Sequence, residues 1–214
     1  MKGNSKSHTY EKLMILVAIL AAMASCQNSN DGADEVIVAP LTEQETADIL
    51  FLREEEKLAR DVYLFSYDMY GQIIFDNISN SEQTHMNSVY TLIAKYNLSD
   101  PTEGKQQGEF QNQVLQNLYD SLASQSSVSL LEALRVGAGI EDLDINDLDG
   151  NISNTIKADL LQVYSSLQCG SRNHLRNFVQ QVENLGGMYE PEFISLDDYN
   201  NIVTSQNERC GLVY

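Results

Sequence analysis

Residues 79–96 place a carboxylate and an imidazole inside an otherwise apolar helix face. Glu82 and His85 are three residues apart, so on a helix they lie on one side. The same side carries apolar residues at steps of three, four and seven: Ile78, Met86, Val89, Leu92, Ile93 and Tyr96. Such a face turns toward a core, where an ionised carboxylate requires hydrogen-bond donors, a cation or a metal. The Glu-x-x-His spacing is also the one with which helical bundles bind pairs of metal ions.

The length and composition fit one globular domain with an acidic surface. The chain has 214 residues, of which 43% are hydrophobic and 21% charged. Thirteen Lys and Arg residues stand against 31 Asp and Glu residues, which gives a formal net charge of −18. A chain this acidic repels nucleic acid and anionic lipid and attracts cations, so we expect no nucleic-acid partner.

The N-terminus predicts export. Lysines precede an apolar run over 13–25, which is too short to span a bilayer and is typical of a signal peptide. The string Met23-Ala-Ser-Cys26 resembles the lipobox of bacterial lipoproteins, which implies cleavage before Cys26 and acylation of its thiol. The alternative is an ordinary secretory signal followed by an incidental cysteine. We expect a signal peptide over 1–25, a lipidated Cys26 with a flexible tether over 26–40, and a location in the cell envelope, facing the periplasm or the exterior.

Two further cysteines, Cys169 and Cys210, remain if Cys26 carries a lipid. Outside the cytoplasm they could form one disulfide, although the sequence does not show whether they are close enough. Such a bridge would tie the last long helix to the C-terminal tail.

Hydrophobic periodicity predicts an all-α domain over 41–187 with four long helices and one short one. The first long helix should run from a cap at Thr42 or Thr46 to about Tyr70 and end at Gly71. The others are expected at 79–96, 110–123, 129–148 and 153–185, with a turn at 149–150 and an irregular tail over 188–214 packed on the bundle. A long crossover between the second and third long helices, containing the short helix, is the topology of ferritin-like four-helix bundles.

Every long helix carries an acidic or histidine side chain within its apolar stripe. A single histidine on an apolar face is more often a packed core residue than a ligand. Coincident polar residues on four helices predict a shared function, since polar residues at core positions otherwise destabilise a fold. Both Glu55 and Glu56 lie within the apolar arc of the first helix, so geometry leaves the choice between them open. The candidate metal-binding residues are Glu56, Glu82, His85, Glu141 and His174, with Asp144 at the edge of the third stripe.

These residues carry a resemblance to known families. The string Glu56-x-x-Ala-Arg-x-x-Tyr63 and the pair Glu82-x-x-His85 are similar to the first two ligand helices of rubrerythrin-type ferritin-like proteins. The chain resembles more closely a prokaryotic ferritin-like family, the domain of unknown function numbered 2202, over residues 42–185. Four strings carry this resemblance: Arg53-Glu-Glu-Glu-Lys-Leu-Ala-Arg-Asp-Val-Tyr63, Asn80-Ser-Glu-Gln-Thr-His-Met86, Val136-Gly-Ala-Gly-Ile-Glu141 and Gly170-Ser-Arg-Asn-His-Leu175.

The resemblance implies a four-helix bundle with a dinuclear metal centre. Carried over by position, Glu82 bridges two metals, His85 and His174 each bind one, and Glu56 and Glu141 are the carboxylates of the first and third helices.

One position departs from this pattern. Ser171 stands where the ferritin-like pattern has a Glu three residues before the last His. Asp144 could replace the missing carboxylate, or one of the two sites could be weak or empty. One or two ions per chain therefore both remain open.

Carboxylates with a few imidazoles suit divalent iron or manganese. The sequence therefore indicates a metal protein with ferroxidase or peroxide-handling activity. Two alternatives stay open, a metal-binding module without turnover and a metal-free helical interaction domain, and a homodimer is possible. Tyr63 could form a hydrogen bond to a ligand of the centre. Four further polar residues could pair with carboxylates that surround the ligands: Arg60, Asp61, Arg172 and Arg176.

Overall fold

The computed structural model describes residues 40–211, which contain six α-helices and no β-strand. The helices are α1 (Glu43–Tyr70), α2 (Ile73–Lys95), α3 (Gln113–Ser126), α4 (Leu130–Ser153), α5 (Ala158–Asn184) and α6 (Leu196–Val203). The predicted all-α class is confirmed. The expected signal peptide, Cys26 and nearly all of the expected tether lie outside the described residues. None of these six helices is both long enough and apolar enough to cross a membrane.

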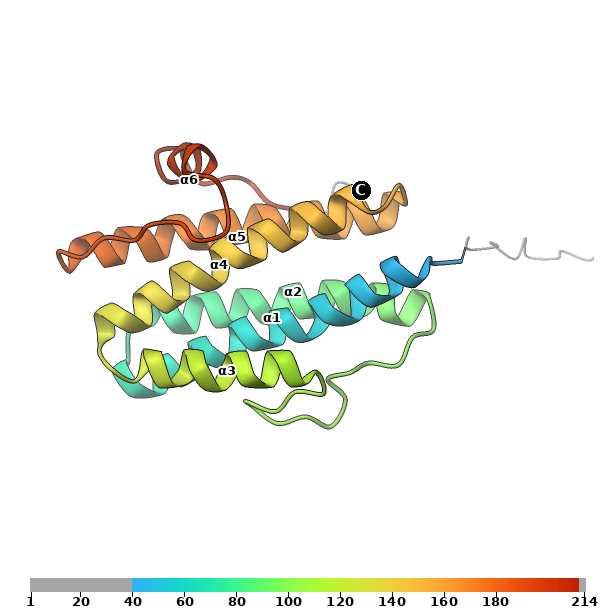
Figure 1. The fold of residues 1–214 in the computed structure, drawn as a ribbon, viewed down its shortest axis with the longest axis horizontal. Helices are drawn as coiled ribbons and strands as arrows, with labels where there is room; N and C mark the ends of the chain where they lie inside the picture. Colours follow the sequence, from blue (N-terminus) through green and yellow to red (C-terminus); the bar gives the residue numbers. More distant parts are fainter. Residues whose placement is uncertain (1–39, 212–214) are drawn as a thin grey trace, which may run out of the picture. The chain divides into compact units, whose positions relative to one another are not determined.

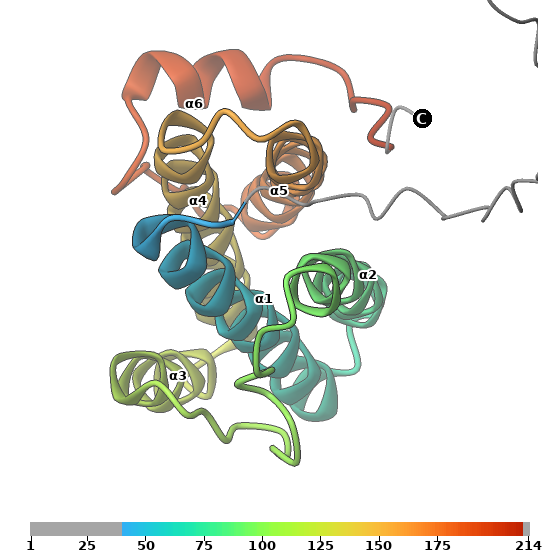
Figure 2. The same ribbon diagram turned by 90° about the vertical axis from the view of Figure 1, so that its right-hand side faces the viewer.

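Four long helices pack as two pairs, α1 with α2 and α4 with α5 (Figure 1). Additional contacts join α1 to α4 and α2 to α5. The view along the helices shows α3 beside α1, and α6 on the outer side of α4 and α5 (Figure 2). The connection from α2 to α4 is the long one and contains α3, as predicted.

The caps of α1 and α4 follow the sequence prediction. Thr42 Oγ1 accepts a hydrogen bond from the Glu45 amide, and the Thr42 amide donates to Glu45 Oε2 at 2.8 Å. Thr42 rather than Thr46 therefore caps α1, in a complete capping box. Gly71, with φ of 63°, ends the helix in the left-handed conformation. Ser129 caps α4 by accepting from the Glu132 amide.

Other helix boundaries were predicted wrongly. The α2 helix begins at Ile73 rather than at 79, because Phe75 and Ile78 extend its buried stripe toward the N-terminus. The α3 helix is shifted toward the C-terminus, because Asn112 caps it. The expected turn at 149–150 lies inside α4, and the real turn separates Ser153 from the first residue of α5. A glycine in an exposed helix costs only about 1 kcal/mol, so Gly150 does not end α4.

The tail after α5 is not entirely irregular, since it contains α6, capped by Ser195. The buried carboxylate of Asp142 holds this tail on α4. It accepts hydrogen bonds from the Tyr189 hydroxyl and from the amides of Glu192, Phe193 and Ile194. Sequence reasoning did not single out Asp142.

Two apolar clusters fill the interior, and buried polar residues lie between them. On α1, one cluster includes Ile49 and Leu52, and the other begins at Leu58. The residues between them, 53–57, are all charged and all buried. On α2 and α5, buried polar residues separate the two clusters in the same way, and on α4 they alternate with apolar residues before Leu148. We call eight of these buried residues the polar layer: Glu55, Glu56, Glu82, His85, Glu141, Asp144, Ser171 and His174.

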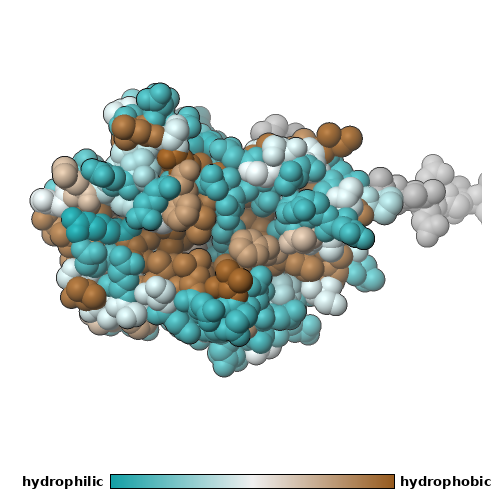
Figure 3. All heavy atoms as spheres, viewed as in Figure 1, coloured by the Kyte–Doolittle hydropathy of each residue, from teal (hydrophilic) through white to brown (hydrophobic). Residues whose placement is uncertain are grey.

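An apolar hollow lies on one face of the molecule, apart from the polar layer. It has a volume of about 390 Å³ and lies between α3, α4 and the start of the tail (Figure 3). Leu122, Ile140 and Phe193 are among its lining residues, and none of the lining residues belongs to the polar layer.

Candidate metal centre

Glu82 lies between two histidines in the polar layer. Its Oε2 atom is 2.8 Å from His85 Nδ1, and its Oε1 atom is 2.8 Å from His174 Nδ1. The two imidazole rings stack with their centroids 5.4 Å apart. Glu82 is 2% exposed, His85 8% and His174 7%. One buried carboxylate thus contacts an imidazole with each of its oxygens.

A second carboxylate completes a group of three on each side of Glu82. Glu56 Oε2 is 3.2 Å from His85 Nδ1, and Glu141 Oε2 is 3.4 Å from His174 Nδ1. In each group, one potential ligand atom per residue lies within 4.8 Å of the others. The structure therefore brings five of the six predicted site residues into two groups that share Glu82.

The small size of Gly170 lets the His85 ring approach α5. A Cβ atom at this position would lie 2.5 Å from His85 Nε2 and 2.6 Å from its Cε1 atom. Because real Cβ atoms do not come this close to a ring, any larger residue at 170 must displace the imidazole. Gly170 is therefore part of the local structure that positions His85.

Asp144, the sixth predicted residue, lies beside the two groups and contacts Ser171, the residue that departs from the ferritin-like pattern. Ser171 Oγ donates a hydrogen bond to Asp144 Oδ2. Burial and the charge of Glu141 raise the pKa of Asp144 to about 7, although the bond from Ser171 opposes this. The serine in place of the missing Glu thus binds a carboxylate from the neighbouring helix.

The sequence left the choice between Glu55 and Glu56 open, and the structure gives the two residues different neighbours. Glu56 contacts His85, whereas Glu55 forms no ion pair with a histidine; burial first, and then the charges of Asp144 and Asp147 on α4, raise its pKa well above the ordinary range. Both are at least 95% buried, with exposures of 5% for Glu55 and 2% for Glu56. Glu56 is the α1 carboxylate that belongs to a three-residue group.

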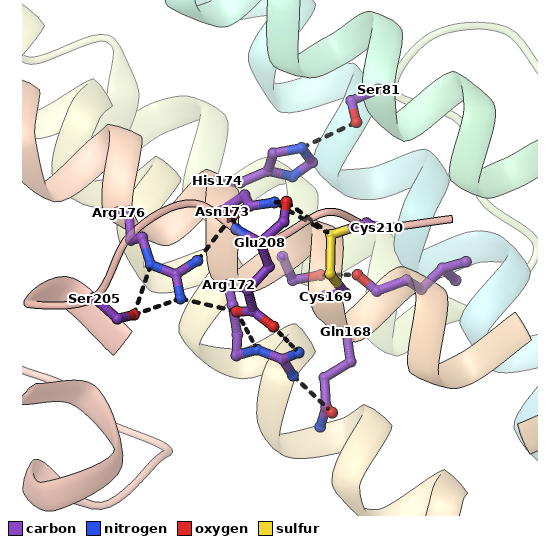
Figure 4. The surroundings of a disulfide bond; sticks show 12 residues. Ser81, Gln168, Cys169, Arg172, Asn173, His174, Arg176, Ser205, Glu208 and Cys210 are labelled. Atoms are coloured by element: carbon purple, nitrogen blue, oxygen red, sulfur yellow. Dashed lines mark hydrogen bonds and ion pairs between the residues drawn. A yellow bond between two sulfur atoms is a disulfide. The ribbon is translucent and has the colours of Figure 1, made fainter. Parts of the chain in front are cut away.

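Two hydroxyl groups hold residues of the cluster from outside. The Tyr63 hydroxyl donates to Glu141 Oε1 at 2.5 Å, so the predicted hydrogen bond of Tyr63 is present. Ser81 Oγ lies 3.0 Å from His174 Nε2, the ring nitrogen that faces away from Glu82 (Figure 4). A partner on the second nitrogen fixes the orientation of an imidazole. Sequence reasoning missed Ser81, although it directly precedes Glu82.

The outer side of α5 binds the C-terminal tail. Cys169 and Cys210 form a disulfide, and Arg172 and Arg176 both bind the carboxylate of Glu208 (Figure 4). The expected pairing of the two arginines with carboxylates around the centre is therefore wrong. They point to the tail, while His174 points from the same helix toward Ser81.

Comparisons with known proteins place this architecture in a family. The family model of the uncharacterized protein domain DUF2202 matches residues 45–206. The chain belongs to this family. The resemblance to family 2202 is thereby confirmed, and the matched residues include all six candidate ligands.

One relative of this DUF2202 protein is the "Uncharacterized protein MJ0754" of Methanocaldococcus jannaschii. It is 46% identical over 170 residues, which is 79% of this chain and 92% of the relative. A solved structure, "Crystal structure of hypothetical protein MJ0754 from Methanococcus jannaschii", matches with a TM-score of 0.79 and 45% identity. The match covers 80% of this chain and 98% of that one. The fold described above is therefore also found in a crystal structure.

Within the DUF2202 domain, the ion pairs of the cluster carboxylates in residues 40–211 are with histidines alone. Other cations near the layer bind elsewhere. Lys57 and Arg60 both bind Asp61, and Arg53 binds Asp100. The expected role of Arg60 and Asp61 around the ligands is therefore wrong, since they pair with each other.

The histidines and Glu82 stabilise each other's charged forms. Burial alone would raise the pKa of Glu82, but His174 and His85 outweigh it and hold that pKa below its ordinary range. Burial opposes protonation of His174, yet Glu82 and Glu141 raise its pKa to about 10. The pKa of His85 is raised in the same way, against burial, by Glu82 and Glu56. A divalent cation would compete with these protons for the same atoms.

Several buried atoms of the polar layer have no hydrogen-bond partner among the described residues. Glu82 Oε1 and His174 Nδ1 face each other at 2.8 Å, but outside hydrogen-bond geometry. An unpaired buried polar atom costs about 1–3 kcal/mol. Carboxylate oxygens and imidazole nitrogens are the ligand atoms that divalent iron and manganese prefer, so the polar layer fits such ions. The unpaired atoms are Glu55 Oε2, Glu56 Oε1, Glu82 Oε1, Asp144 Oδ1 and His174 Nδ1.

Proposed function

We propose that this DUF2202 protein is a ferritin-like metal protein that binds two divalent iron or manganese ions in the polar layer. The observation that carries the proposal is the pair of buried three-residue groups that share Glu82. Four long helices with a long connection between the second and third, each contributing to one buried centre, support a ferritin-like bundle.

The residues divide between two ions. Glu56 and His85 would hold one ion, Glu141 and His174 the other, and Glu82 would bind both. Asp144, positioned by Ser171, would supply the carboxylate that the ferritin-like pattern has at position 171. These four carboxylates would balance the charge of two divalent cations, which meets the requirement that buried charges be paired.

Bound iron would supply the electrons to reduce dioxygen or peroxide, and ferroxidase or peroxide-handling activity is the chemistry that we propose. The chain's own residues organise the surroundings. Tyr63 holds Glu141 by a hydrogen bond, and Ser81 holds the outer nitrogen of His174. The apolar clusters on both sides keep bulk water from the layer, which strengthens electrostatic interactions within it.

We further propose that the protein works outside the cytoplasm, anchored by a lipid on Cys26 after removal of residues 1–25. The apolar run over 13–25 followed by Cys26 supports this. The disulfide between Cys169 and Cys210 supports it independently, since disulfides persist in oxidising compartments. A metal-binding module without turnover has the same ligands and differs only in lacking activity.

The metal-free interaction domain is the main competing function. In that case protonated His85 and His174 alone would neutralise Glu82. The unpaired oxygens of Glu56 and Asp144 favour the metal protein, because two protonated imidazoles do not provide them with donors.

Metal content tests the proposal. The chain is purified without chelator, loaded with Fe(II) without oxygen, and its iron is counted per chain, followed by oxygen and peroxide assays. We expect about two ions in the wild type, none in Glu82→Gln, and an unchanged number in Glu132→Gln, whose carboxylate binds Arg135 far from the layer. One ion would mean that Ser171 removes the second site. A folded wild type without metal would contradict the proposal.

A further inference from the structure

The apolar hollow between α3, α4 and the start of the tail is separate from the candidate metal centre (Figure 3). Its volume of about 390 Å³ falls within the range of small-molecule sites in proteins, about 300–1,000 Å³. Each of the three segments contributes apolar side chains to its lining. They include Leu118 and Leu122 of α3, Ile140 and Leu143 of α4, and Met188 and Phe193 of the tail.

Two apolar side chains of the lining remain in contact with solvent. Met188 is 74% exposed and Phe193 is 45% exposed. The backbone is nevertheless held at both positions. Arg135 Nε donates to the Met188 carbonyl oxygen at 3.1 Å, and the Phe193 amide donates to Asp142 Oδ2 at 3.1 Å. A concave apolar surface that is fixed and still exposed is typical of a binding site.

Gly139 keeps part of the hollow open. It is one of the lining residues on α4, and a Cβ atom at this position would meet only the Tyr189 hydroxyl, at 3.8 Å. Gly137 differs, because a Cβ atom there would lie 2.5 Å from the Phe178 ring. A glycine inside a helix costs about 1 kcal/mol relative to alanine. Packing requires this cost at Gly137 but not at Gly139, where the glycine instead leaves room for a ligand.

The charges around the hollow favour a cation. Four charged residues line it, and two of them, Glu132 and Arg135, pair with each other at 2.5 Å. The other two, Glu190 and Glu192, are exposed. They take part in none of the ion pairs within residues 40–211. The guanidinium in the lining is therefore neutralised, while two carboxylates are left to attract a positive charge.

We propose that this hollow binds a small organic cation with an apolar body, an ammonium compound that carries a ring or an alkyl chain. The apolar body would fill the space beside Gly139, and the ammonium group would face Glu190 and Glu192. The Phe193 ring could add a cation–π contact. The formal net charge of −18 also favours a cation, and it opposes an anionic ligand or a second copy of this chain. This inference does not depend on metal binding in the polar layer.

Calorimetric titration of the full chain with naphthylmethyl-trimethylammonium tests the inference. Two further probes separate the apolar body from the charge. Naphthylmethanesulfonate has the same ring with a negative charge, and tetramethylammonium has the positive charge without the ring. We expect one naphthyl cation to bind per chain, and each of the other two probes to bind at least about tenfold more weakly, because each lacks one of the two features.

Gly139→Leu tests whether the ring enters the hollow. The leucine side chain would occupy the space of the ligand, so affinity for the naphthyl cation should fall at least about tenfold. Gly150→Leu is the matched control on the same helix. A Cβ atom at Gly150 has no neighbour within 4 Å, and Gly150 does not line this hollow. Its affinity should stay within about twofold of the wild type, since exposed substitutions have small effects.

The double variant Glu190→Gln/Glu192→Gln tests the charge. Two exposed ion pairs together contribute about fivefold to affinity, so binding of the naphthyl cation should weaken by about that factor. Glu43→Gln/Glu103→Gln removes the same net charge from two exposed residues that do not line the hollow. This control should change affinity less than about twofold, because salt screens distant charges.

Four results would overturn the inference. They are no binding of the naphthyl cation to the wild type, equal or tighter binding of the sulfonate, and equal weakening in the variants and their controls. The fourth is a wild-type dimer in light scattering that Gly139→Leu converts to a monomer, which would assign the hollow to a second copy of the chain. Glu190 and Glu192 are exposed, so their variant keeps the test decisive if Gly139→Leu does not fold.

Discussion

Buried carboxylates occur in two kinds of surroundings in this protein, and the contrast identifies the candidate centre better than burial does. Asp142 and Asp61 are both 0% exposed, and donors surround each of them. Asp142 holds the tail through a tyrosine hydroxyl and three amides, and Asp61 binds Lys57, Arg60 and the Gly108 amide. These carboxylates are structural.

The carboxylates of the polar layer are also buried, but several of their oxygens have no donor. Glu56, Glu82 and Asp144 each keep an oxygen without a hydrogen-bond partner, and their charged neighbours are two histidines and one another. A fold that satisfies Asp142 so completely could satisfy these residues in the same way. The difference shows that burial alone does not distinguish a candidate binding site from a structural carboxylate. Oxygens without a hydrogen-bond partner do.

We expect the largest change in stability when the carboxylate of Asp142, which holds the tail on α4, is removed. Asp142→Ala leaves four donors of the tail without their acceptor, so we expect the free energy of unfolding to fall by about 2–4 kcal/mol in urea titrations. Metal content per folded chain should not change, because Asp142 is outside both three-residue groups. Loss of metal from a folded Asp142→Ala variant would contradict the view that Asp142 is structural and separate from the metal-binding residues.

Substitutions at Gly170 and Gly150 should change the free energy of unfolding by intermediate amounts and in opposite directions. Gly170→Ala introduces a Cβ 2.5 Å from His85 Nε2, and we expect a net loss of about 1–3 kcal/mol in unfolding free energy and weakened ion binding by His85. Gly150→Ala is the control in α4, where a Cβ has no neighbour within 4 Å, and it should stabilise by up to about 1 kcal/mol. A stabilising Gly170→Ala would show that the His85 ring is not held where we describe it.

The smallest effect concerns the tail clamp on the outer side of α5. The hydrogen bond from Arg172, helped by Arg176 and opposed by burial, lowers the pKa of Glu208 from 4.5 to about 2. Its stabilising contribution is therefore complete above pH 4.5 and is lost as the pH falls toward 2. Glu208 is partly solvated, so we expect about 1 kcal/mol or less.

Urea titrations of the wild type and Glu208→Gln at pH 7, 5 and 3 measure this contribution. The difference between the two proteins should be constant from pH 7 to 5 and smaller at pH 3. A difference that persists unchanged at pH 3 would mean that the clamp does not depend on the charge of Glu208.

The sequence predicted those parts of the centre that depend on position along a helix. Apolar stripes placed Glu82, His85, Glu141 and His174 on inward faces, and the structure brings them together. The choice of Glu56 over Glu55 was not predictable, because the two residues are adjacent on α1 and the packing of α2, which brings His85 to Glu56, decides between them.

Long-range partners were also beyond the reach of sequence patterns. The path of the tail brings Glu208 to Arg172 and Arg176, and no local pattern specifies that path. The bond from Ser171 to Asp144 likewise depends on how α4 packs on α5. From the sequence, Ser171 indicates only that a metal ligand is missing. The structure shows that Ser171 binds the carboxylate of Asp144.

Anomalous diffraction from crystals grown with Mn(II) or Fe(II) tests the central claim most directly. We predict two peaks, one beside Glu56 and His85 and the other beside Glu141 and His174, with Glu82 between them. A well-ordered crystal with saturating metal and no peak in the polar layer would contradict the account. The polar layer would then be held by protonated histidines alone.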